Sequence, residues 1–107
     1  MELIPVPDIA AALGVPVTRV REYLRDGHLV GVREDGVLRV PAELVQDGAI
    51  VKHLPSVITQ LRDARFADGE ILEWLFREDE SLPGTPISAL RANRGSEVKR
   101  RAQVAGY

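Results

Sequence analysis

Five arginines lie within residues 17–41, in two groups whose spacing suits the binding of a polyanion. The first group belongs to a predicted helix, where Thr18, Arg21 and Arg25 recur at i, i+3 and i+7 and therefore share one face. The second group follows in the next segment of the chain. A guanidinium group donates hydrogen bonds from a planar fork that matches phosphate oxygens and guanine edges. These residue types could therefore bind the backbone and the bases of a nucleic acid.

Two short helices within residues 8–27 would position the first group. In each half of this stretch, apolar residues recur at the spacing of an amphipathic helix. Between the halves, Gly14 suits the positive φ of a helix C-cap, and Pro16 cannot continue one helix but can open the next. This order is typical of a helix-turn-helix, whose second helix enters the DNA major groove. A solvated helix face with internal Arg–Glu pairs is the alternative. In the first interpretation, the side chains nearest to base edges are Thr18, Arg19 and Arg21.

A β-hairpin is predicted over residues 29–41, around the Asp-Gly dipeptide at 35–36. A two-residue loop would place an arginine beside an apolar residue on both faces of the hairpin. A three-residue loop, residues 34–36, pairs Val32 with Leu38 instead and separates apolar from charged side chains. We therefore expect the second register. It brings two arginines to one outward face, where the flank of this wing, rather than its acidic tip, would contact phosphates: Arg33 and Arg39.

The order of these elements carries a resemblance. Residues 9–15 (IAAALGV), residues 20–29 (VREYLRDGHL) and the hairpin resemble, in that order, the small winged helix-turn-helix of MerR-type regulators and phage excisionases. Pro16 departs from the pattern, because such proteins often carry a Ser or Thr cap there, worth ~1 kcal/mol. The long dimerising coiled coil of MerR-type regulators is also absent. The DNA contacts predicted for this half are Thr18, Arg19, Arg21, Arg25, Arg33 and Arg39.

The second half of the chain predicts a helical lobe. We expect a winged helix-turn-helix in residues 1–48 and four helices in residues 49–107, so the fold class is mainly α with one β-hairpin. The expected helices cover residues 54–65, residues 68–77 with Asp68 as N-cap, a segment opened by Thr85-Pro86 and ended by Gly95, and residues 97–105 with Ser96 as cap. If the last helix lies on the side of the second, it adds further DNA-binding candidates, Lys99, Arg100 and Arg101.

Four segments of this half extend the resemblance to nearly the whole chain. They are VKHLP at 51–55, LRD at 61–63, EILEWLF at 70–76 and EVKRRAQ at 97–103. With them, the chain is similar to a family of small actinobacterial DNA-binding proteins that join a winged helix-turn-helix to a C-terminal helical domain of poorly understood role. The resemblance implies sequence-specific binding of double-stranded DNA in transcriptional control.

The overall charge argues against DNA binding unless the cations gather on one face. The net charge is −2, whereas DNA-binding surfaces are usually basic. The charges are uneven, since residues 63–80 carry seven acids against two arginines and residues 91–101 carry five cations against Glu97 alone. We therefore expect modest affinity, steep salt dependence, or a need to form a homodimer.

Enzyme chemistry finds no support in the sequence. With no cysteine, neither a disulfide nor a thiolate metal site is possible, and His28 and His53 lack nearby ligands at metal spacing. The serines have no convincing His–Asp partners, and there is no Gly-rich phosphate loop. No apolar run reaches the length of a membrane span. We expect a cytoplasmic protein that needs no cofactor or metal, is not an enzyme and does not enter a membrane.

A second hypothesis gives the C-terminal lobe a protein partner. Trp74-Leu75, followed by Leu82, Gly84, Pro86, Leu90 and Glu97-Val98, resembles the end of the toxin-binding domain of certain Xre-type antitoxins. The same spacing arises in any Trp-containing helix followed by a capped helical pair, with the tryptophan in the core. In this alternative the protein is an interaction module, antitoxin-like or dimerising, with weak DNA binding.

Overall fold

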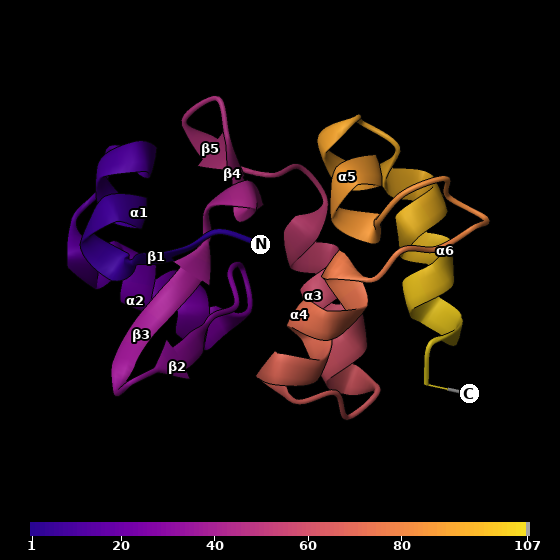
Figure 1. The fold of residues 1–107 in the computed structure, drawn as a ribbon, viewed down its shortest axis with the longest axis horizontal. Coiled ribbons are helices and arrows are strands. Elements are labelled where there is room, and N and C mark those ends of the chain that lie inside the picture. Colours follow the sequence, from indigo (N-terminus) through magenta and orange to yellow (C-terminus); the bar gives the residue numbers. More distant parts are fainter. Residues whose placement is uncertain (107) are drawn as a thin grey trace.

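The computed structural model describes residues 1–106, and it divides into a winged-helix lobe and a lobe of four helices (Figure 1). This confirms the predicted fold class. The first lobe contains β1 (Leu3–Pro5), α1 (Val6–Leu13), α2 (Val17–Asp26), β2 (Val32–Glu34) and β3 (Val37–Pro41). A short connection follows, made of the 3-10 turn η1 (Ala42–Leu44) and the two-stranded ribbon of β4 (Val45–Gln46) and β5 (Ala49–Ile50). The second lobe contains α3 (Leu54–Asp63), α4 (Asp68–Phe76), α5 (Pro86–Arg91) and α6 (Gly95–Val104).

The turn between α1 and α2 forms as the sequence predicts. Gly14 adopts φ 68°, and its amide donates to carbonyls of the last turn of α1. Pro16 is extended, with φ −65° and ψ 154°, and its carbonyl accepts from the amide of Arg19 at 3.0 Å. No side chain caps α2, as expected from a proline at this position. The side chains of Ile9 and Val20 are fully buried between the two helices and the rest of the lobe.

The register of the hairpin differs from the predicted one. Val32 pairs with Arg39 and Arg33 pairs with Leu38, so the loop is the two-residue Asp35-Gly36. Both loop residues have positive φ, 52° and 78°, as a type I′ turn requires. The twist of such a turn matches the right-handed twist of the strands, and in so short a hairpin this outweighs the separation of apolar and charged faces.

A third strand, β1, completes the sheet in the order β1-β3-β2. The sequence predicts no strand in residues 1–5, but Leu3 pairs with Pro41 and Ile4 with Val40. On the other side of β3, the chain entering β2 approaches closely at Gly31, where an added Cβ would lie 2.6 Å from the carbonyl oxygen of Arg39. The central strand of the wing is therefore held from both sides.

Two helix starts in the C-terminal lobe also differ from expectation. Asp68 is the first residue of α4 and not its cap, because Ala67 takes the cap position and its amide donates to the Glu70 carboxylate at 2.9 Å. Gly95 begins α6 instead of ending α5, so Ser96 lies inside the helix. A Cβ at Gly95 would lie 2.4 Å from Cδ2 of His53, so a glycine allows α6 to meet the start of α3. The predicted cap at Thr85 is confirmed: its hydroxyl accepts from the Ser88 amide at 3.1 Å.

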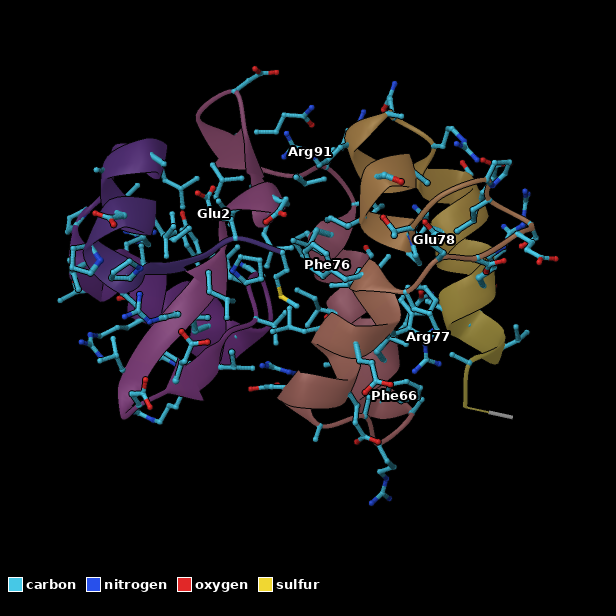
Figure 2. All side chains as sticks on the ribbon, viewed as in Figure 1. Glu2, Phe66, Phe76, Arg77, Glu78 and Arg91 are labelled. Carbon is cyan, nitrogen blue, oxygen red and sulfur yellow. The ribbon has the colours of Figure 1, made fainter. Side chains whose placement is uncertain are left out.

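The two lobes share one core and are also joined by two arginines. Their buried apolar side chains form a single cluster. Arg91 of α5 reaches the connection and donates to the carbonyls of Glu43 and Val45, at 2.8 and 2.9 Å (Figure 2). Arg62 of α3 donates to the carbonyls of Leu24 and Arg25 at the end of α2. The lobes are therefore fixed relative to each other. No helix among residues 1–106 is long and apolar enough to cross a membrane.

Candidate nucleic-acid interface

The outer face of α2 carries the predicted polar side chains together. Thr18, Arg19, Arg21 and Arg25 are all exposed, whereas Val20 faces the core. This arrangement follows from the helical period, because the apolar stripe that includes Val20 turns the i, i+3, i+7 positions outward. The helix therefore presents a hydroxyl and three guanidinium groups to solvent.

Two of the three arginines of α2 form ion pairs with neighbouring carboxylates. Arg19 lies 3.5 Å from Glu22, and Arg25 donates to Asp26 at 3.1 Å, a hydrogen bond that raises the pKa of the Arg25 guanidinium. All four side chains are about half exposed or more, and exposed pairs contribute roughly 0–1 kcal/mol, so a phosphate can displace the carboxylate at small cost. Arg21 forms no ion pair within residues 1–106. It is the guanidinium group of α2 that is most available to a ligand.

The wing does not present its two arginines together. Because Arg33 and Arg39 occupy adjacent pairs of the observed register, they lie on opposite faces of the hairpin, which corrects the expectation of one shared outward face. Arg33 is exposed, and its Nη1 donates to the carbonyl of Gly36 at 3.3 Å. Arg39 is only partly exposed and lies 3.6 Å from Glu34. Its Nε is buried and has no hydrogen-bond partner in the described part of the chain.

The three cations of α6 are divided between two sides of the helix. Lys99 and Arg100 line a groove that also includes His28, just beyond the end of α2. Arg101 instead holds the loop after α4, where it donates to the hydroxyl and carbonyl of Ser81 and lies 3.8 Å from Asp79. The pKa of Asp79 is lowered, mainly by hydrogen bonds from Ser81 and less by Arg101. Arg101 is thus bound to the loop after α4. Of these three cations, Lys99 and Arg100 are the two that line the groove next to the end of α2.

Arg62 is a functional candidate that we did not predict. Its two terminal nitrogens donate to the carbonyls of Leu24 and Arg25, at 3.2 and 3.4 Å, and one also bonds Asp68 at 3.1 Å. These carbonyls belong to the last turn of α2, where a cation is favoured by the helix dipole. The contact spans 37 and 38 residues of sequence, so no local pattern indicates it. Through this contact the C-terminal lobe supports the end of α2.

No metal centre accompanies this surface: residues 1–106 contain no group of three or more His, Cys, Asp or Glu side chains arranged to hold an ion. The features that remain are an exposed, arginine-bearing second helix, a hairpin wing and a supporting helical lobe. Together they define a winged helix-turn-helix protein with a C-terminal helical domain.

Comparison with known families places the chain more narrowly. Residues 1–45 match the family described as "DNA-binding protein Rv2175c, wHTH domain", and residues 51–106 match the "Rv2175c C-terminal domain of unknown function". The chain belongs to the Rv2175c family.

Two comparisons with individual proteins agree with this assignment. The chain is 41% identical, over 115 aligned residues, to DNA-binding protein Rv2175c of Mycobacterium tuberculosis; the alignment covers 95% of this chain and 79% of the relative. The solved NMR structure of Rv2175c superposes with a TM-score of 0.89 at 39% identity, covering 99% of this chain and 82% of that one. The resemblance to a family that joins a winged helix-turn-helix to a C-terminal helical domain is therefore confirmed, and this relative comes from an actinobacterium.

Proposed function

We propose that this protein binds double-stranded DNA sequence-specifically and acts in transcriptional control. In this proposal α2 lies in the major groove, where Thr18, Arg19 and Arg21 reach base edges and Arg25 contacts the backbone. The flank of the wing contributes Arg33 to phosphates, with Arg39 as a weaker contributor. The proposal assigns no catalytic role to any residue. One observation carries the proposal: Arg21 is exposed and forms no ion pair within residues 1–106. It lies on the second helix of a winged helix-turn-helix whose family is described as DNA-binding.

We also propose that the two domains have different roles, one in binding DNA and the other in supporting it. We assign residues 1–48 to the winged helix-turn-helix and residues 49–107 to the supporting lobe. The match to the first family ends at residue 45 and the match to the second begins at residue 51, one on each side of this boundary. The shared core and the Arg62 and Arg91 contacts favour domains that move as one body.

Replacing Arg21 tests the proposed function. The target duplex is first selected from a random pool with the wild-type full-length protein. Arg21→Ala should then weaken binding to the selected duplex by roughly 5- to 150-fold at constant salt, since one good base contact contributes about 1–3 kcal/mol. Arg77→Ala is the matched control, because Arg77 is also exposed but directly follows α4, where it is paired with Glu73. Equal affinities of Arg21→Ala and wild type would remove the basis of the proposal.

One observation favours a protein-binding role for the second lobe as an alternative. Phe66 and Trp74 are partly exposed and line a hollow beside α4 with Glu70, Glu73 and Arg77, which is paired with Glu73 (Figure 2 labels Phe66 and Arg77). An aromatic surface bordered by carboxylates suits a basic segment of a partner or of a second copy. Sedimentation velocity of the full-length protein from 1 to about 100 µM, with Trp74→Ala beside wild type, tests self-association. A monomer throughout that range would rule out the homodimer.

A further inference from the structure

A polar groove in the second lobe begins where the recognition helix ends. It lies between α3 and α6 and has a volume of about 690 Å³. Its walls carry hydroxyl, amide and cationic side chains, and no acidic residue is among them. The residues that line it are His28, Pro55, Ser56, Thr59, Gln60, Ser96, Lys99, Arg100 and Gln103. The groove is thus rich in donors and suited to anionic oxygens.

The two cations of the groove have no carboxylate partner in residues 1–106. Two neighbouring arginines are paired: Arg94, just before α6, with Glu97, and Arg101, within α6, with Asp79. Lys99 and Arg100 form no such pair in these residues. The positive potential extends to the start of α3, where the pKa of His53 is lowered by burial and additionally by Lys99 and Lys52. The cations of the groove are therefore free to meet an external anion.

The groove lies next to the end of α2. His28 follows α2 by two residues and is one of the residues that line the groove. Arg62 ties α3 to the last carbonyls of α2, and at Gly27 an added Cβ would lie only 3.0 Å from its Nη1. Figure 1 shows α3 between α2 and α6, so these three helices form a row along the molecule.

The acidic residues of α4 and of the loop after it lie outside the groove. Glu70, Glu73, Glu78, Asp79 and Glu80 line hollows formed by α4 and the loop after it, which share no residue with the groove. Figure 2 shows Phe76 on α4 and Arg77 and Glu78 just after it; in this view α4 lies in front of α3, and the loop that follows crosses in front of α6. A duplex lying along α2, α3 and α6 would therefore meet cations and donors, together with the arginine-paired carboxylates of Glu22 and Asp26, while the acidic residues of α4 stay on other surfaces.

We infer that the C-terminal lobe is a second DNA-binding surface, in which Lys99 and Arg100 hold backbone phosphates of the same duplex that α2 reads. This inference rests on the proposed function and gives a role to the second domain. The longest dimension of the molecule is 36 Å, which equals about ten base pairs of B-DNA. A recognition helix and wing alone cover only a few base pairs, and the groove extends the footprint along the backbone. Contacts of this kind add affinity and fix register without reading sequence.

The salt dependence of binding tests the inference, using the full-length protein and the selected duplex. Lys99→Gln/Arg100→Gln should lower the slope of log K against log[salt] by about 2 and weaken binding by roughly 10- to 60-fold near 0.1 M salt, because each phosphate contact releases about 0.9 counterion. It should weaken a random duplex by a similar factor. Arg65→Asn/Arg77→Gln is the control, since it removes two exposed cations outside the groove and Asn tolerates the φ of 72° at position 65.

Three outcomes separate this inference from the proposed function. If the groove variant loses slope and affinity while the control does not, the second surface is supported. If both double variants keep the wild-type slope while Arg21→Ala still loses affinity, DNA binding stands and the groove is not part of it. If wild type binds no duplex at all, both proposals fail together. Thermal unfolding checks that each variant keeps its fold, which is expected because the substituted side chains are on the surface.

Discussion

The affinity of α2 for a polyanion depends on how firmly neighbouring carboxylates hold its arginines. Arg19 is paired with Glu22 one helical turn away, and the pair is about half exposed. Such a pair is worth little to folding, yet it places a negative charge beside the surface proposed to meet phosphates. The carboxylate therefore opposes DNA binding more than it supports the helix.

Removing that carboxylate should strengthen DNA binding. Glu22→Gln frees Arg19 and removes one repulsive charge, so binding to random duplex at low salt should tighten by roughly two- to ten-fold, and the gain should shrink as salt is added. Fluorescence anisotropy across a salt series measures this change. Glu73→Gln is the matched control, because it also frees an exposed arginine, Arg77, but one that lies just after α4. If both substitutions tighten binding equally, net charge alone is responsible and α2 has no special position.

Which arginines are exposed could be predicted, but which are free could not. Helical period alone places Thr18, Arg21 and Arg25 outward, and the structure agrees. Arg101, by contrast, belongs to the same basic run as Lys99 and Arg100 yet is bonded to Ser81, 20 residues away. Such a bond depends on where the loop after α4 lies, and a charge pattern along the chain does not contain that information.

At the level of secondary structure, the orientation of α2 depends on a residue from another lobe. Arg62 satisfies two carbonyls that would otherwise lack a partner at the end of the helix. It also couples the recognition helix to α3, and through α3 to α6. The support is thus charge-assisted and long-range.

Loss of this support should lower stability. Arg62→Gln should reduce the free energy of unfolding by roughly 1–2 kcal/mol, because charge-assisted hydrogen bonds to partly buried carbonyls are lost. Urea unfolding followed by circular dichroism measures the loss. Asp68→Asn is the control, since it removes only the exposed ion pair with Arg62, worth roughly 0–1 kcal/mol. A loss no greater than that of Asp68→Asn would contradict the supporting role of Arg62.

The elements with strong local signals were predictable, and those set by tertiary contacts were not. Helix α3, predicted over residues 54–65, buries Leu54, Val57, Ile58 and Leu61, because an apolar stripe at helical spacing is a local property. The predicted hairpin register was wrong because the type I′ preference of Asp-Gly outweighs the separation of apolar and charged side chains between the two faces. Strand β1 was missed because three residues gain strand geometry only by pairing with β3.

At the scale of the whole molecule, an acidic protein can bind DNA only if its charges are separated. The net charge is −2, but most of the excess acid lies on α4 and the loop after it, while α2, the wing and α6 carry Arg21, Arg33, Lys99 and Arg100, which form no ion pair within residues 1–106. One face is then attractive to a polyanion and the other is repelled. The molecule should approach DNA in a single orientation, with an affinity that falls steeply as salt screens both effects.

Mapping the bound duplex onto the protein tests this account most directly. The measurement is an NMR titration of the isotope-labelled full-length protein with the selected duplex, in which each backbone amide reports whether its surroundings change. We predict shifts concentrated in residues 18–25, around Arg33, and around Lys99 and Arg100, with residues 68–80 unchanged. Shifts confined to residues 68–80, or none at duplex concentrations above the protein, would contradict the claim that the arginine face of α2 is the DNA-binding surface.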